Sequence, residues 1–176
     1  MKVTIISEYG YKEAMMGLSL SRNQPLENMY EVSMKLYDKD GAHNKFLESI
    51  SVWLDVVAPR YFWQQLDTYR VGVSKQSEST MYSLMKKSSF TKNDFEGDIP
   101  IKILSELQYL LKNKDFETLK SSLPEGFLQR RIVRTDYLTL RRIVKQRKYH
   151  RLREWKYFCD EILTQIEFRT YFEDLK

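Results

Sequence analysis

The residues best suited to chemistry are the arginines and lysines gathered toward the carboxyl end of the chain. Between Gln129 and Lys156, eleven Lys and Arg side chains stand against two acids, a local charge of +9. The whole chain carries +5, so the remainder sums to −4 and the excess positive charge is concentrated in this window. Concentrated positive charge favours an anionic partner, and phosphate is the obvious one, carried either by a small nucleotide or by a polymer.

Three arginines in this window could bind one phosphate group. Arg130 and Arg134 fall on one face of an expected strand, and Arg147 lies at the end of the helix expected after it. A planar guanidinium binds phosphate oxygens bidentately, so a short strand–turn–helix unit could bring these groups to one cavity. The alternative is that arginines near a helix end only favour its dipole and remain solvated.

The remaining reactive side chains give weaker signals. Cys159 is the only cysteine, which excludes an internal disulfide, and it shares an apolar helical face with Trp155 and Phe158. This placement predicts a buried core residue rather than a nucleophile. His43 and His150 have no Cys or His neighbours at metal-ligand spacing, so we predict no metal site.

These side chains must be positioned by short strands and helices. Apolar and polar residues alternate from Ile50 to Val56, a period of two that predicts a strand closed by Pro59. Further strands are expected at Val3–Ser7 and Leu128–Arg134. Helices are expected at Lys12–Leu20, at about 26–36, at Tyr61–Thr68, from Asp98 with Pro100 in the first turn, from a cap at Thr135 or Asp136, and from His150 or Leu152.

Two polar segments lack clean periodicity. Residues 69–82 predict an ordered loop with short extended pieces, and Lys86–Gly97 predicts a mobile surface loop. A chain of 176 residues fits a single domain over 1–176, an α+β fold with a small mixed sheet and packed helices. Apolar runs stay well short of the ~18 residues of a membrane helix, and we expect neither a signal peptide nor a membrane partner, so cytoplasm is the default location.

The basic window resembles the C-terminal half of the flavin-dependent thymidylate synthases. That family has a Leu-Pro turn, an arginine-bearing strand, an Asn that starts a helix and an arginine at the end of that helix. At matching intervals this chain has Leu123-Pro124, Arg130, Asp136 in place of the Asn, and Arg147. Upstream, the family's His, Glu, Ala-Pro and Gln correspond to His43, Glu48, Ala58-Pro59 and Gln65, and its second His falls on Ser49.

The family's signature, Arg-His-Arg-x-x-Ser-x-Asn-Glu-x-Ser-x-Arg-Tyr, is matched in part by residues 69–82, which read YRVGVSKQSESTMY. Ser74, Ser79 and Tyr82 match, whereas the opening triplet has become Tyr-Arg-Val and the last arginine has become Met81. A one-residue insertion before Ser74 would instead align Arg70 with the second arginine of the triplet. Met81 cannot bind a phosphate as that arginine would, and Lys75 or Arg70 could bind it instead.

The resemblance implies a flavin- and folate-dependent one-carbon transfer to C5 of deoxyuridine monophosphate (dUMP), or hydroxymethylation as a close variant. It implies a substrate site of Gln65, Ser79, Arg130 and Arg147, and a cofactor site of His43, Arg70, Ser74 and Asp136. FAD, methylenetetrahydrofolate and NADPH would be the cofactors. The family uses no enzyme nucleophile and places its active sites between the subunits of a homotetramer. A divergent, phage-borne subgroup would carry departures of this kind.

Two other interpretations remain open at this point. A catalytically altered or inactive relative would bind pyrimidine nucleotides without completing the reaction. A basic nucleic-acid-binding module would use the same cations to grip a backbone, with Tyr137, Tyr149 and Trp155 stacking bases.

Overall fold

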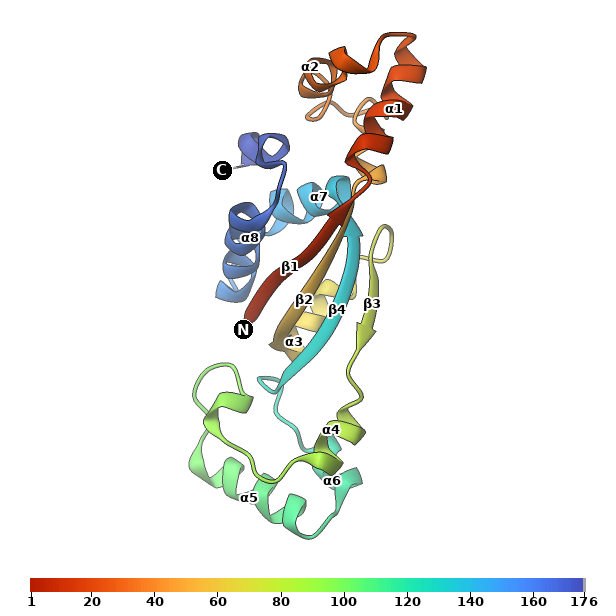
Figure 1. Ribbon diagram of the computed structural model, residues 1–176. Helices are drawn as coiled ribbons and strands as arrows, with labels where there is room; N and C mark the ends of the chain where they lie inside the picture. Colours follow the sequence, from red (N-terminus) through yellow and green to blue (C-terminus); the bar gives the residue numbers. More distant parts are fainter. Residues whose placement is uncertain (176) are drawn as a thin grey trace. The chain divides into compact units, whose positions relative to one another are not determined.

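The computed structural model describes residues 1–175 and contains one four-stranded sheet with helices around it (Figure 1). The strands are β1 (Lys2–Tyr9), β2 (Ser51–Pro59), β3 (Ser74–Ser77) and β4 (Leu128–Asp136), in the order β1-β2-β4-β3. The amide of Arg60 donates to the carbonyl of Phe127, and that of Tyr137 to that of Ile50, so β2 and β4 are antiparallel. The arrows of neighbouring strands alternate throughout, where a mixed sheet was expected. The α+β class, a small sheet with packed helices, is confirmed.

The helices are α1 (Tyr11–Arg22), α2 (Met29–Met34), α3 (Arg60–Leu66), α4 (Thr80–Lys86), α5 (Ile101–Lys112), α6 (Phe116–Ser121), α7 (Tyr137–Arg147) and α8 (Arg153–Gln165), with 3-10 turns η1 (Leu26–Asn28), η2 (Lys45–Ser49), η3 (Lys92–Asp94) and η4 (Arg169–Leu175). Every predicted strand and helix is present. Two starts differ. The helix expected at about 26–36 is a 3-10 turn followed by α2, which starts at Met29. Helix α5 begins after Pro100 rather than at Asp98, because a proline keeps the residue before it out of the helical region. Five helices and turns were not predicted, namely α4, α6, η2, η3 and η4, whereas β3 is a short extended piece of the kind expected within residues 69–82.

The chain forms two compact units, each assembled from separate segments of sequence. Unit 1 contains Met1–Lys2, Val56–Thr68 and Gln76–Ile132. Unit 2 contains Val3–Asp55, Tyr69–Lys75 and the chain from Val133 onward. The expectation of a single domain over residues 1–176 stays a prediction.

Unit 1 has its own apolar core, in which α4 and α5 both pack against α6. The segment Lys86–Gly97, predicted to be a mobile surface loop, belongs to this core because Phe90 and Phe95 are buried in it. The Phe90 amide donates to the side-chain oxygen of Gln108, and a capping box between Thr91 and Asp94 closes η3. Two polar residues of this segment, Thr91 and Asp94, thus cap η3 between two buried phenylalanines.

Unit 2 is held by an aromatic core where α7 meets α8 and η4. Tyr137, Tyr171 and Phe172 are fully buried, and the Tyr137 ring contacts the other two edge-on. The Tyr11 ring, at the start of α1, stacks on Phe168 with centroids 4.0 Å apart. The N- and C-terminal parts of the chain therefore meet within this unit. Within residues 1–175, no helix combines the length and apolar character needed to cross a membrane.

Candidate functional site

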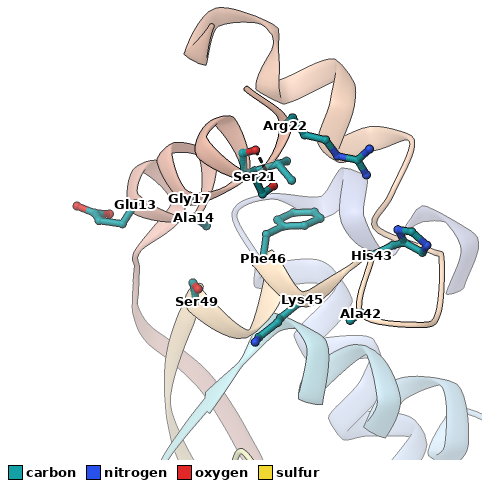
Figure 2. Close-up of a pocket in the computed structure, with 11 residues that line it drawn as sticks. Glu13, Ala14, Gly17, Ser21, Arg22, Ala42, His43, Lys45, Phe46 and Ser49 are labelled. Carbon is teal, nitrogen blue, oxygen red and sulfur yellow. Dashed lines mark hydrogen bonds between the residues drawn. The ribbon is translucent and has the colours of Figure 1, made fainter. Parts of the chain in front are cut away.

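A cavity of about 330 Å³ in unit 2 is lined by α1, η2 and the loop before η2. Three of its lining residues carry nitrogen-bearing side chains, Arg22, His43 and Lys45, and Ser49 adds a hydroxyl. Figure 2 shows the Arg22 guanidinium and the His43 imidazole on the same side of the cavity. Donors of this kind suit an anionic group, and the cofactor role that the resemblance implies for His43 stays a prediction.

Two glycines shape this cavity. Gly10, at the turn from β1 to α1, has a φ of 95°, and an added Cβ would lie 2.3 Å from the Ser49 carbonyl oxygen. Only glycine therefore lets α1 close onto η2. Gly17 lines the cavity, and an added Cβ there would meet no heavy atom of residues 1–175 within 4 Å, which keeps this wall open.

The cavity also brings together two positions that the resemblance pairs with histidines of the family. His43 and Ser49 are the positions matched to that family's two histidines, and both line this one cavity. The role of these two positions toward a cofactor stays a prediction.

The first part of the signature segment, Tyr69–Lys75, packs on the N-terminus of α7. Gly72 has a φ of 75°, and an added Cβ would lie 2.8 Å from an Asp136 carboxylate oxygen and 2.2 Å from the Thr139 hydroxyl. The absence of a side chain at Gly72 thus permits this close approach. The structure therefore places Asp136 beside the segment that carries Arg70 and Ser74, both of which are exposed.

Asp136 itself is the N-cap of α7, as predicted from the sequence. Its carboxylate accepts hydrogen bonds from the Thr139 amide at 2.8 Å and the Thr139 hydroxyl at 3.0 Å. Burial raises the pKa of Asp136, and the two bonds from Thr139 oppose that change in pKa. The carboxylate is thus engaged in holding the helix, and its role toward a cofactor stays a prediction.

Arg147 lies at the last turn of α7 against two aromatic rings. Its Nε donates to the Tyr69 hydroxyl at 2.8 Å, and its guanidinium carbon lies 4.8 Å from the Trp155 ring centroid and 5.5 Å from that of Tyr69. The residue is half-buried. Arg147 is therefore held in place rather than freely solvated.

Three of the four predicted substrate residues belong to unit 1. The Arg130 amide donates to the Glu78 carboxylate at 2.9 Å, and the Glu78 amide donates to the Arg130 carbonyl at 3.1 Å. These bonds bring Arg130 beside Ser79, which is the N-cap of α4. Gln65 is half-buried on α3. The fourth residue, Arg147, belongs to unit 2.

Other arginines of the basic window are engaged within the fold. Arg134 donates to the Ser51 hydroxyl at 2.9 Å, and Arg131 bonds to both carboxylate oxygens of Asp67 while stacking 4.5 Å from the Trp63 centroid. The local charge of +9 is therefore partly engaged within the fold, while Arg142, Lys145 and Arg151 are exposed. The suggestion that Arg134 joins Arg130 and Arg147 around one phosphate receives no support from its contacts.

Met81, which stands where the family has its last signature arginine, lines a second cavity of about 570 Å³ in unit 1. Arg60 from α3 and Lys120 from α6 line the same cavity, together with Glu117. Neither cation was predicted as a site residue, and α6 was not predicted at all. Phe116 and Lys120 lie four residues apart in a helix of only six residues, and so short a segment shows no clear apolar periodicity. Helix α6 could therefore not be predicted from the sequence.

The remaining sequence predictions concern Cys159 and metals. Cys159 is fully buried, and burial raises the pKa of its thiol to about 12, so its role as a core residue is confirmed. In the part of the chain that the structure describes, no group of three or more His, Cys, Asp or Glu side chains is placed to hold a metal ion.

Comparison with solved structures resolves the fold. Thymidylate Synthase X (ThyX) from Helicobacter pylori, crystallised with FAD and dUMP, superposes with a TM-score of 0.84 at 16% sequence identity, and the match covers 99% of both chains. A further structure of the flavin-dependent thymidylate synthase ThyX from Helicobacter pylori, complexed with FAD and dUMP, gives a TM-score of 0.82 at 16% identity and the same coverage. The chain has the fold of the flavin-dependent thymidylate synthases. No protein-family model and no curated protein matches its sequence.

The flavin-dependent thymidylate synthase fold thus persists although the opening triplet of the signature does not. In this chain the triplet's first position is Tyr69, a residue that contacts Arg147. In the sequence, position 69 could be compared only with the family's arginine. Its contact with a residue 78 positions away became visible only in the fold.

Proposed function

We propose that this chain binds dUMP and transfers a one-carbon unit to its C5 with FAD as cofactor. The observation that carries the proposal is a superposition covering 99% of the chain onto proteins crystallised with FAD and dUMP. The positions that resemble the family's substrate site hold suitable groups: a helix-capping hydroxyl at Ser79, exposed Arg130, and Arg147 with its guanidinium held by aromatic rings.

The protein's part in this reaction is binding and orientation. A nucleotide phosphate carries about two negative charges, which guanidinium groups bind with short, charge-assisted hydrogen bonds. Gln65 can donate and accept through its amide, which suits the edge of a pyrimidine. No side chain needs to attack the substrate, in keeping with a buried Cys159 whose thiol has a pKa of about 12.

The residues of the His43 cavity fit part of a flavin nucleotide. Arg22, His43 and Lys45 supply donors for phosphate oxygens, and the open face of Gly17 leaves room beside them. When bound, reduced FAD would supply the hydride that turns the methylene group of methylenetetrahydrofolate into a methyl group on C5 as the C5 proton leaves, with NADPH restoring the reduced flavin. Arg70 and Ser74 would extend this cofactor site from the Tyr69–Lys75 segment.

Assembly into a homotetramer is part of the proposal. Within unit 2, large apolar side chains are exposed on β1 and α1: Ile6, Tyr9, Met16 and Leu20, the last of them 83% exposed. Apolar groups of this size are enriched where subunits meet. Light scattering coupled to size-exclusion chromatography of the purified chain tests this proposal, and a monomer would contradict it.

The proposed function is tested by three measurements on freshly purified protein. An absorbance band near ~450 nm reports bound oxidised flavin. Calorimetric titration with dUMP reports the nucleotide site, and tritium release from dUMP labelled at C5, with methylenetetrahydrofolate and NADPH added, reports the reaction. All three signals are expected. Methyl and hydroxymethyl products are separated by chromatography of the labelled nucleotide.

The same measurements separate the alternatives. Binding of dUMP without flavin or tritium release identifies an inactive relative. Tight, steeply salt-dependent binding of random single-stranded DNA without dUMP binding identifies a nucleic-acid module. The contacts of Arg131 and Arg134 within the fold argue against the last outcome, because they reduce the positive charge that is free to bind a polymer.

A further inference from the structure

Tyr69 occupies the position at which the resembled family begins its Arg-His-Arg triplet, and its hydroxyl takes part in a directed chain of hydrogen bonds. It accepts a bond from Nε of Arg147 at 2.8 Å and donates its own proton to the Gln146 side-chain oxygen at 2.9 Å. A phenol has one proton to donate and lone pairs to accept with, so these two bonds use it in both roles. The direction of each bond is therefore fixed.

Trp155 completes the enclosure of Arg147. It is fully buried, and its ring meets that of Tyr69 edge-on, with centroids 6.2 Å apart. The guanidinium carbon lies within cation–π range of both rings. Two rings and one hydrogen bond thus fix the plane of the guanidinium and the direction of its Nε. We call Tyr69 and Trp155 the Arg147 clamp.

The clamp leaves the terminal nitrogens of Arg147 available. Within residues 1–175, the buried side-chain nitrogen and oxygen atoms that lack a hydrogen bond are Arg131 Nε and Thr135 Oγ1. The terminal nitrogens of Arg147, which form no hydrogen bond to the described residues, are therefore not buried and face solvent. A guanidinium has five N–H donors, and the clamp uses the one at Nε. The free edge is the two-nitrogen fork that binds an oxyanion bidentately.

We propose that Tyr69 is a positioning residue that holds Arg147 ready for an oxyanion of a pyrimidine nucleoside monophosphate, an inference that rests on the proposed function. Position 69, an arginine in the resembled family, here holds a tyrosine that orients an arginine of the substrate site. An arginine loses several rotatable bonds of freedom when it binds a ligand. A clamped Arg147 has lost that freedom on folding, so the ligand binds more tightly than it would to a mobile side chain.

The test compares Tyr69→Phe with Tyr149→Phe in the full-length protein. Both changes remove one phenol hydroxyl from the same basic region, and Tyr149 is 88% exposed. Tyr69→Phe is expected to weaken dUMP binding about tenfold, the effect of losing one hydrogen bond to a charged group. Tyr149→Phe is expected to leave binding unchanged. Deoxyuridine without phosphate, titrated in parallel, is expected to bind both variants like the wild type if Arg147 binds the phosphate.

A second measurement distinguishes positioning from a general structural role. The NMR signal of the Arg147 Nε–Hε group is assigned by its loss in Arg147→Lys. We expect this signal to report an ordered side chain in the ligand-free wild type and a mobile, averaged one in Tyr69→Phe. The two proteins are expected to have equal midpoints of thermal unfolding. Equal dUMP affinity of wild type and Tyr69→Phe overturns the proposal while leaving the proposed function intact. A wild type that binds no dUMP overturns both, and an ordered Nε–Hε signal in Tyr69→Phe overturns the positioning role alone.

Discussion

Helix α7 carries two arginines in its middle, Arg141 and Arg142, and a third at its end, and unit 2 uses Arg141 and Arg147 in opposite ways. Arg141 is buried, forms two 2.8 Å bonds to the carboxylate of Asp174 and also donates to the Tyr171 carbonyl. Arg147 donates from Nε alone and leaves its outer nitrogens exposed to solvent. Arg141 therefore stabilises the fold, whereas Arg147 is the arginine that we propose binds a ligand.

The two arginines are six residues apart in the same basic window, and nothing in their local sequence separates them. The difference comes from distant segments of chain. The turn η4 brings a carboxylate and a carbonyl to Arg141, whereas Tyr69–Lys75 brings only a phenol to Arg147. A cluster of charge in a sequence thus indicates that an anion is needed nearby, without saying whether the protein or a ligand supplies it.

The largest effect is expected from Arg141→Ala. This change leaves the Tyr171 carbonyl without its donor and removes two bonds to Asp174, which is itself exposed, so we expect a loss of about 2–3 kcal/mol in the free energy of unfolding. Urea denaturation followed by tryptophan fluorescence measures it. Arg142→Ala, at the exposed neighbouring position, is the control and is expected to lie within about 0.5 kcal/mol of the wild type. A small loss in Arg141→Ala would end the distinction between the two arginines.

The parts of the fold that local chemistry determines were predicted from the sequence. Alternating apolar and polar residues predicted β2, and apolar residues at helical spacing predicted α8. Asp136 was one of two residues predicted to start α7, because aspartate caps helices through its own side chain. The burial of Cys159 followed from the face that it shares with Trp155.

The parts that depend on distant partners could not be predicted in this way. Strand β3 reads Ser-Lys-Gln-Ser, which has no strand propensity, and is extended because it pairs with β4. Turn η4 is fixed by contacts from Arg141 and Lys148. The candidate site could be predicted only in part for the same reason. In the sequence, tyrosine at position 69 is the loss of an arginine of the family's signature. In the structure, this tyrosine contacts Arg147.

An arginine added to a cavity of unit 1 tests the comparison between paired and ligand-binding arginines. The new guanidinium would be available to a ligand, as we propose for Arg147. Met81→Arg places a guanidinium beside Arg60 and Lys120, and we expect dUMP affinity to rise about tenfold, or about 1.4 kcal/mol. Calorimetric titration measures it. Met85→Arg adds the same charge to an exposed position of α4 and is the control. Equal affinities of the two variants would place the nucleotide phosphate elsewhere.

Asp136 tests the opposite case, a charge that the fold accepts at a cost. Asp136→Ala removes the cap of α7 and is expected to lower the free energy of unfolding by about 1 kcal/mol. Asp136→Asn keeps a capping oxygen without the buried charge. Because burial raises the pKa of Asp136, the ionised form is disfavoured in the fold. The free energy of unfolding of the Asn variant is therefore expected to exceed that of the wild type at neutral pH. In acid, where Asp136 is protonated, this difference is expected to disappear. Urea midpoints across pH that stay parallel would contradict this expectation.

The smallest effect is expected at Glu8, whose carboxylate joins β1 to the core of unit 2. It accepts hydrogen bonds from the Tyr137 hydroxyl and, at 2.9 Å, from the Glu167 amide. The pKa of Glu8 is raised above its usual value of 4.5, and burial is the largest cause. The hydrogen bond from Tyr137 acts in the opposite direction and lowers the pKa.

A raised carboxyl pKa means that the folded protein binds a proton more tightly than the unfolded chain does. The stability that Glu8 contributes is therefore fully present below pH 4.5 and is lost as the pH rises through its folded pKa. Glu8→Gln retains an oxygen for Tyr137 and cannot ionise, so its free energy of unfolding should fall less steeply above pH 4.5 than that of the wild type. The pKa of Asp136 is also raised, so it would add to the same pH dependence. The measurement therefore compares Asp136→Asn with the double variant that carries both Asp136→Asn and Glu8→Gln. The plots of their free energy of unfolding against pH then differ only through Glu8. Curves of equal slope would show that Glu8 keeps its ordinary pKa in the fold.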